Sequence, residues 1–258
     1  MVYPGRMADT SHALSTSVLK ERLEAAFPSL LEELTQLVAI PSVSSDPAHA
    51  ADVERSAEHI RERFAALGLE AKVLRETAED GTEGKPALVA HTPHIEGAPT
   101  VLLYAHHDVQ PVGELDRWSM DPYKAEVRGA RIYGRGSPDD GAGVVVHLGS
   151  LSILGADLPV NVAIFFEGAE EIGSPSFTAF LDAHRDELAA DVIIVTDSSN
   201  WKVGEPAVTT TLRGNAIVTV DVTVADHAVH SGAFGGPLLD SVAISSMLIA
   251  SLFDDAGD

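Results

Sequence analysis

TVLLYAHHDVQP, residues 100–111, joins a mostly apolar run to three ionisable side chains. A short apolar run that ends in polar residues is typical of a strand buried on both faces of a sheet. In open α/β sheets, ligands bind beyond the carboxyl ends of such strands. We therefore expect His106, His107 and Asp108 to lie at a ligand-binding edge of a sheet.

Similar apolar runs recur on both sides of this stretch and alternate with helical patterns. The other predicted strands are EAKVLR (70–75), PALVAH (86–91), NVAIFFEG (161–168) and DVIIVTD (191–197). The predicted helices are residues 17–40, with Pro28 as a break or a new start, and residues 53–68, 141–154 and 176–188. Strands that alternate with helices predict an α/β fold, with a mostly parallel central sheet flanked by helices.

The pattern changes after Arg213. AIVTVDVTVA (216–225) alternates like a half-buried strand, and PLLDSVAISSMLIASLF (237–253) resembles a helix. One strand and one helix cannot form an independent domain. We therefore expect one large domain over residues 1–212 and only the beginning of a smaller α+β domain over residues 213–258, with the rest missing or supplied by another chain.

The composition excludes several classes of protein. Thirty-nine acidic residues against 17 basic ones give a net charge of −22, which disfavours nucleic acid and anionic membranes as partners. The sequence has no cysteine, so disulfides and thiolate chemistry are excluded. The N-terminus lacks the apolar core of a signal peptide, and no apolar run is long enough to span a membrane. We therefore expect a cytoplasmic protein.

Ionisable residues follow three of the expected strands and precede one helix. They are His106, Asp108, Asp139, Asp140, Glu167, Glu170, Glu171 and Asp197. A histidine with several carboxylates at one edge indicates a cation site, because unpaired buried carboxylates are costly and raise each other's pKa values. Imidazole and carboxylate ligands without thiolate suit zinc, with manganese or cobalt as substitutes. Several carboxylates can hold two ions, and Glu170 and Glu171 can divide the roles of proton acceptor and ligand.

Four motifs, in this order, resemble those of a known family: HHDVQP, YGRGSPDDGAG, FEGAEEIGS and VTDSS. The family is that of the co-catalytic dizinc peptidases, which includes carboxypeptidase G, aminoacylase, acetylornithine deacetylase, succinyl-diaminopimelate desuccinylase and the carnosinase-like dipeptidases. The resemblance implies that His106 and Asp197 hold one zinc ion, that Asp139 bridges two, and that Glu171 holds the second. It also implies a cis peptide between Asp139 and Asp140.

The resemblance assigns the catalytic roles as well. Glu170 is then the general base, and Asp108 orients the ring of His106. DHAVHSGAFGG (226–236) resembles the lid motif of the carnosinase-like members, in which His230 reaches the substrate carbonyl across a dimer and stabilises the oxyanion. This motif favours a metallopeptidase that cleaves dipeptides over a deacylase of N-acyl amino acids, and it implies a homodimer in the complete protein.

Two features depart from the family pattern. Gly141 stands where the family usually has a lysine. The family's remaining metal ligand, a histidine near the C-terminus, has no candidate in this sequence. We therefore expect the chain alone to bind one zinc ion tightly and a second weakly, with little peptidase activity. The alternative to an enzyme is a catalytically incomplete product that binds a single metal ion.

Other assignments stay open at this point. His107 can replace His106 if the strand shifts by one residue, and His227 can replace His230 in the lid. We expect Glu167 to be a structural acid at a strand end. We expect His147 to be structural. We expect His12, His59 and His184 to be solvated.

Overall fold

The structure is a computed structural model that describes residues 14–155 and 158–254. The chain divides into two compact units, Met1–Ala207 and Val208–Asp258, and each is described by itself. His12, which the sequence predicts to be solvated, lies outside the described residues.

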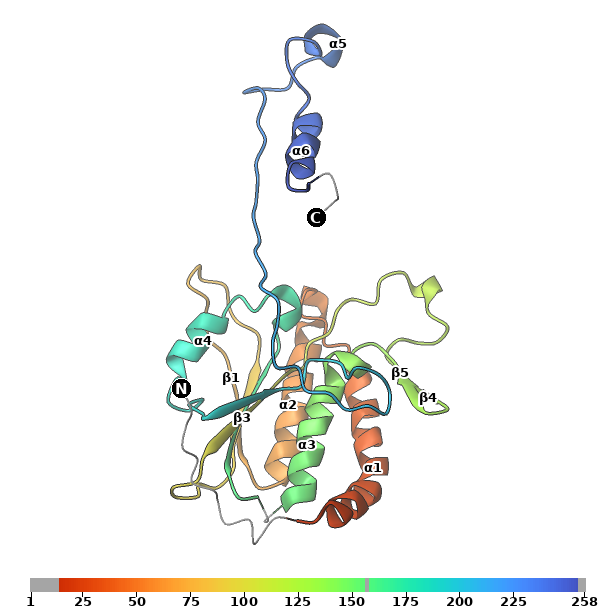
Figure 1. The fold of residues 1–258 in the computed structure, drawn as a ribbon, viewed down its shortest axis with the longest axis vertical. Coiled ribbons are helices and arrows are strands. Elements are labelled where there is room, and N and C mark those ends of the chain that lie inside the picture. The colour runs from red at the N-terminus through yellow and green to blue at the C-terminus, as the bar shows by residue number, and fades with distance from the viewer. Residues whose placement is uncertain (1–13, 156–157, 255–258) are drawn as a thin grey trace. The chain divides into compact units, whose positions relative to one another are not determined.

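The first unit is built around a five-stranded sheet (Figure 1). In spatial order the strands are β1 (Glu70–Leu74), β2 (Ala87–His91), β6 (Asn161–Glu167), β3 (Thr100–His106) and β7 (Val192–Val195). β3 pairs in parallel with β6 and β7, whereas β2 is antiparallel to both of its neighbours. Every strand except β2 therefore runs in one direction, which confirms the predicted α/β fold with a mostly parallel sheet. A separate hairpin consists of β4 (Glu126–Arg128) and β5 (Arg131–Tyr133).

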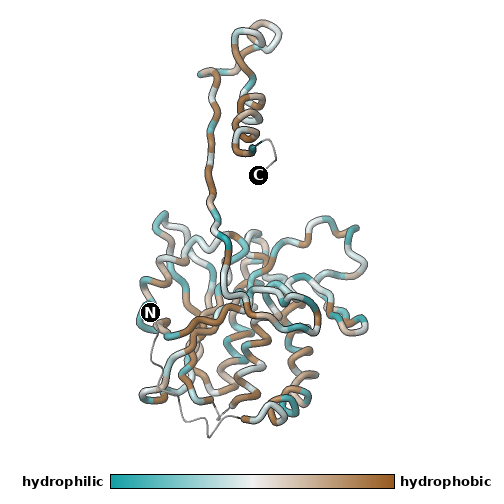
Figure 2. The backbone as a smooth tube through the Cα atoms, viewed as in Figure 1, coloured by the Kyte–Doolittle hydropathy of each residue, from teal (hydrophilic) through white to brown (hydrophobic). Residues whose placement is uncertain are grey.

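Helices cover the sheet, and their apolar side chains pack against it to form the hydrophobic core. They are α1 (Thr16–Val38), α2 (Ala50–Ala66), α3 (Ala142–Leu154) and α4 (Phe177–Ala183). Successive strand residues face opposite sides, so Leu103 packs with α2 and α3 while Leu102 packs on the side of α4. Figure 2 shows the hydrophobic character of the central strands that supply both clusters.

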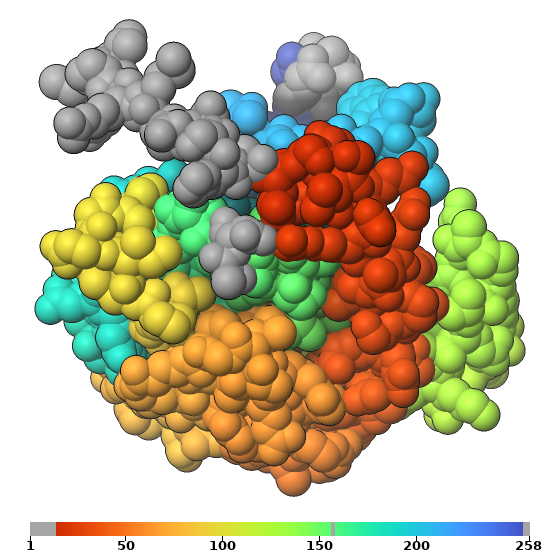
Figure 3. All heavy atoms as spheres, turned by 90° about the horizontal axis from the view of Figure 1, so that it is seen from below, coloured from red at the N-terminus to blue at the C-terminus, as the bar shows by residue number. Residues whose placement is uncertain are grey.

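The helix α1 is continuous. Pro28 lies inside it, and therefore neither breaks the helix nor starts a new one. α1 and α2 lie side by side, in red and orange in Figure 3. Glu33 of α1 joins them, because its carboxylate lies 2.6 Å from Nε2 of His59 and 3.2 Å from Nε of Arg63.

Phe64 of α2 is the clearest test of this core. Its side chain has no exposed area, and its ring meets that of Phe166 edge to face at a centroid distance of 5.4 Å. We expect Phe64→Ala to lower the free energy of unfolding by about 3–5 kcal/mol, because it leaves a cavity beside a buried ring. Urea denaturation followed by circular dichroism measures this. Phe27→Ala is the matched control: Phe27 is 59% exposed, so a loss below about 1 kcal/mol is expected. Equal losses would contradict the assignment of the core.

The strand β7 differs from its prediction. DVIIVTD was expected to form a buried strand, but the four residues Val192–Val195 are 45–61% exposed. β7 is an edge strand of the described sheet, and its side chains are open on both faces. An apolar sequence predicts a strand correctly, but it does not reveal whether other elements cover that strand.

Over residues 208–254, the second unit forms the helices α5 (Ser231–Phe234) and α6 (Ser241–Ala250). The predicted helix is confirmed by α6, whose first turn is capped by the carboxylate of Asp240. The strand predicted over residues 216–225 is wrong for the described structure, where this segment forms no ladder. A strand exists only through hydrogen bonds to a partner, and none of the described residues pairs with the segment. Across the described residues, we find no helix with the length and apolar content needed to cross a membrane.

Candidate metal centre

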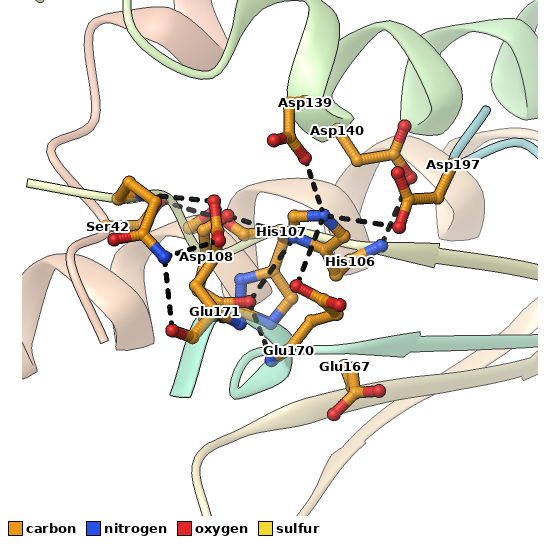
Figure 4. Close-up of polar contacts among 12 residues, drawn as sticks. Ser42, His106, His107, Asp108, Asp139, Asp140, Glu167, Glu170, Glu171 and Asp197 are labelled. Atoms are coloured by element: carbon orange, nitrogen blue, oxygen red, sulfur yellow. Dashed lines mark hydrogen bonds and ion pairs between the residues drawn. The ribbon is translucent and has the colours of Figure 1, made fainter. Parts of the chain in front are cut away.

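Three side chains gather at the carboxyl edge of the sheet: His106 at the end of β3, Asp139 in the short helix η4 (Ser137–Gly141), and Asp197 just after β7. One ligand atom from each lies within 4.8 Å of the others. Nε2 of His106 is 3.0 Å from Oδ1 of Asp139 and 3.9 Å from Oδ2 of Asp197. Figure 4 shows the carboxylates turned toward the imidazole ring.

The topology explains why these residues meet. β3 and β7 are parallel neighbours, so His106 and Asp197 emerge at the same edge. Asp139 reaches that edge from η4, which precedes α3, and its peptide bond to Asp140 is cis, as predicted. Strand pairing and the start of α3 therefore bring together three residues that are far apart in the sequence.

His106 is completely buried, whereas the side chain of Asp139 is 59% exposed. Burial lowers the pKa of His106, but the carboxylates of Asp108, Asp140 and Glu170 outweigh it and raise the pKa to about 10. The surroundings of this ring therefore favour a positive charge. The negative charge around the site suits a divalent cation. One imidazole nitrogen and two carboxylate oxygens are donors that suit an ion of the zinc type.

Asp108 links the ring of His106 to the turn that carries the two glutamates. Nδ1 of His106 lies 3.1 Å from the backbone oxygen of Asp108 and 3.4 Å from its Oδ1. The same carboxylate accepts hydrogen bonds of 3.1 Å from the backbone N–H groups of Glu170 and Glu171. Burial opposes its ionisation, but the hydrogen bond with His106 helps to hold the pKa of Asp108 below its usual range. Asp108 therefore fixes both the imidazole and the helix η6 (Glu170–Ile172).

We expect Asp108→Asn to weaken zinc binding by about 10–100-fold, the usual effect of losing a partner of a metal-binding histidine. The two backbone N–H groups bond different oxygens of Asp108, and in asparagine one of these atoms becomes an N–H₂ donor that would face a backbone N–H. Calorimetric titration with zinc measures the affinity. Asp182→Asn is the matched control, because Asp182 lies on the surface of α4 and pairs with Arg185. Wild-type affinity in Asp108→Asn would show that Asp108 does not hold the ring.

Glu170 also lies beside the ring of His106. Its Oε2 lies 4.0 Å from Nε2 of His106, and its side chain is partly open to solvent. Burial raises the pKa of Glu170 and His106 opposes it, but the nearby charges of Asp197 and Glu171 act in the same direction as burial, so the pKa is raised. A carboxylate with a raised pKa beside a cation site is a candidate proton acceptor.

Glu171 is placed differently from its neighbour. Its Oε1 accepts the backbone N–H of Gln110 at 3.1 Å, and its Oε2 accepts the side-chain amide of Gln110 at 2.7 Å. Among the described residues, Glu171 does not belong to the group formed by His106, Asp139 and Asp197. Sequence reasoning missed Gln110, although it stands in the same HHDVQP motif.

The neighbouring candidates have other partners. His107 is buried and its Nε2 donates to the backbone oxygen of Pro86 at 2.9 Å, so the register in which it replaces His106 is wrong. Glu167 accepts a 2.6 Å hydrogen bond from the hydroxyl of Tyr104, as expected for a structural acid. Burial raises the pKa of Glu167.

Three further histidines of the first unit, His147, His59 and His184, have structural roles. His147 is buried and stacks on Phe166, as expected. The prediction that His59 and His184 are solvated is wrong, because both are largely buried and pair with carboxylates. Those carboxylates include Glu33 and Glu76, which are distant in sequence and so gave no signal.

The two lid candidates belong to the second unit. Nδ1 of His230 accepts the backbone N–H of Gly232 at 3.0 Å. A neutral ring in this state carries its proton on Nε2. His227 instead pairs with its neighbour Asp226. Of the two histidines, His230 therefore has the better defined hydrogen-bond donor, the N–H at Nε2.

Gly141, the departure from the family pattern, is closely surrounded. A Cβ atom added there would lie 2.7 Å from the backbone oxygen of Gly136 and 3.1 Å from Cδ1 of Leu34. The local backbone therefore leaves no room for a side chain at this position, which gives a physical reason for glycine.

Comparison with known proteins gives consistent matches. The model of peptidase family M20/M25/M40 matches residues 102–245. A cysteinylglycine-S-conjugate dipeptidase of Corynebacterium striatum is 34% identical over 233 residues, which are 88% of this chain and 50% of that protein. The human Beta-Ala-His dipeptidase is 30% identical over 237 residues, which are 89% of this chain and 44% of that protein.

Solved structures agree with this similarity. The crystal structure of human carnosine dipeptidase 1 has a TM-score of 0.70 and 26% sequence identity, over 95% of this chain and 54% of that one. The chain thus spans about half the length of the curated relatives that it matches.

Proposed function

The chain belongs to peptidase family M20/M25/M40, and on that premise we propose that it carries the metal centre of a hydrolase that cleaves dipeptides. The observation that supports this most strongly is the group formed by His106, Asp139 and Asp197, with Glu170 beside it. The relatives named above are dipeptidases, which favours a dipeptide substrate.

In the proposed mechanism His106, Asp139 and Asp197 would hold one divalent ion, which we propose to be zinc. When bound, such an ion would polarise the amide carbonyl and make a nearby water molecule more acidic. Glu170 would accept the proton of the attacking water on Oε2, the oxygen that faces His106. Its raised pKa suits this role, because a general base works best when its pKa approaches the working pH.

The residue that positions the proposed base, Asp108, lies at the same edge of the sheet. Asp108 holds the backbone of Glu170 and the ring of His106 with one carboxylate. As a result, the proton acceptor and the ligand have a fixed spacing before substrate binds. Such preorganisation reduces the reorganisation needed during the reaction.

A second ion belongs to this proposal. Asp139 would bridge the two ions and Glu171 would bind the second, after releasing Gln110 from at least one carboxylate oxygen. Two carboxylates hold zinc less firmly than a site that includes imidazole. We therefore propose unequal affinities for the two ions in this chain.

His230 completes the proposed machinery. Its Nε2–H would donate to the oxyanion that forms on the substrate carbonyl, while Gly232 orients the ring through Nδ1. We propose that this donation occurs across a homodimer formed through residues of the second unit. Exposed apolar side chains on α6, such as Val242 and Ile249, favour an interface there.

A substrate panel tests the function. Cys-Gly and β-Ala-His represent the substrates named for the relatives, and N-acetyl amino acids represent the deacylase alternative. Rates are measured with added zinc or manganese, on this chain and on a protein that contains it at the full length of its relatives. Hydrolysis of the dipeptides alone would support a dipeptidase. Hydrolysis of the N-acyl substrates alone would replace it by a deacylase.

A further inference from the structure

Asp140, the neighbour of the ligand Asp139, makes two hydrogen bonds that tie separate parts of the chain together. Its side chain is almost completely buried. Oδ2 accepts the backbone N–H of His106 at 3.3 Å, and Oδ1 accepts the backbone N–H of Gly143 at 3.1 Å. One carboxylate therefore connects the end of β3 to the first turn of α3, as Figure 4 shows for the contact with His106.

Gly143 makes this arrangement possible because it has no side chain. A Cβ atom at Gly143 would lie 2.1 Å from Oδ1 of Asp140 and 2.6 Å from its Cγ and Oδ2. Real Cβ atoms do not approach other atoms so closely. Any other residue at position 143 would thus displace the carboxylate of Asp140.

An ordinary helix cap would not need this geometry. A capping carboxylate bonds the N–H groups of its own helix. Asp140 does bond α3 through Gly143, but its other oxygen is used by the strand that carries His106. Its backbone is also joined directly to Asp139. The carboxylate is thus connected to two ligand-bearing segments at once.

We infer that Asp140 is a positioning residue of the metal centre, and that the missing side chain of Gly143 allows it to act. By holding the backbone N–H of His106, Asp140 sets the position of the imidazole relative to Asp139. This inference rests on the metal centre of the proposed function, but it requires no peptidase activity.

Gly143→Ala is the decisive variant, because it leaves every polar group of the centre chemically intact. We expect zinc affinity, measured by calorimetry, to fall by about 10–100-fold, the usual range for loss of a group that supports a ligand. The visible absorption of the cobalt-loaded protein should also shift, because its bands depend on ligand geometry. A purely structural role would leave that spectrum unchanged.

Gly149→Ala is the matched control. Gly149 also lies in α3, and the atoms nearest to its added Cβ belong to the flexible side chain of Leu30, the first at 2.8 Å. Both substitutions raise helix propensity equally. We expect Gly149→Ala to keep the affinity and the cobalt spectrum of the wild type. Thermal melting by circular dichroism confirms that each variant is folded.

A double variant tests whether Gly143→Ala acts by displacing the carboxylate of Asp140. In Asp140→Ala the obstructing carboxylate is gone, so adding Gly143→Ala should cause no further loss of zinc affinity. Additive losses, an equal loss in Gly149→Ala, or wild-type affinity and spectrum in Gly143→Ala would each overturn the inference. If the wild type binds no divalent ion, the proposed metal centre fails and this assignment fails with it. If the wild type binds zinc but hydrolyses no dipeptide, only the proposed function fails.

Discussion

Glu170→Gln is expected to lower dipeptide turnover by about 10²–10⁴-fold, the usual contribution of general base catalysis. Glutamine keeps the shape of the side chain but cannot accept a proton at neutral pH. The bound metal should remain, because the described ligand group consists of His106, Asp139 and Asp197. Kinetics and metal content are measured together on a protein that contains this chain and hydrolyses dipeptides.

Two comparisons make this result specific. Glu171→Gln removes the adjacent carboxylate and is expected to lower the content of the second ion. Glu96→Gln replaces a fully open carboxylate and should change neither quantity. If Glu170→Gln loses metal together with activity, Glu170 is a ligand and the role of base must pass to another residue.

Titration of the 258-residue chain with zinc is expected to show about one tightly bound equivalent and a much weaker second one. In the proposed centre the first ion would have the imidazole and two carboxylates of the group His106, Asp139 and Asp197. The second would have only Asp139 and Glu171. His106→Ala should abolish the tight equivalent, because it removes the only imidazole of the described group. Calorimetry with a parallel dipeptide assay measures both properties.

His59→Ala serves as the control for that substitution. His59 pairs with Glu33 between α1 and α2 and is not part of the ligand group. It should therefore keep the tight equivalent. Two tight equivalents with robust turnover in the wild type would refute the prediction, and would show that this chain or a second copy supplies a further ligand.

The sequence predicts the strands and the ligand edge because both depend on local order. An apolar run such as VLLYA forms a strand, and parallel pairing then brings the residues that follow β3 and β7 to one edge. His106 and Asp197 could be proposed on this basis. The proton-accepting role of Glu170 stays a prediction, although its position beside His106 agrees with it.

What the sequence does not predict depends on partners elsewhere in the chain. The exposure of β7 depends on what covers it, and the segment 216–225 needs a pairing strand to be one itself. His59 and His184 meet carboxylates that only the tertiary fold brings near. The role of Gly143 is invisible in the sequence, because the residue acts through the space that it leaves free.

The open edge of β7 has a practical consequence for work in solution. On the side away from β3, none of the described strands pairs with it, so its backbone and apolar side chains form a template on which further strands can add, the first step of aggregation. Asp197 lies two residues after the end of this strand, so a strand added there would crowd one of the three candidate ligands. The metal stoichiometry should therefore be determined at several protein dilutions. A value that rises on dilution would identify self-association, rather than a defective ligand set, as the cause of incomplete loading.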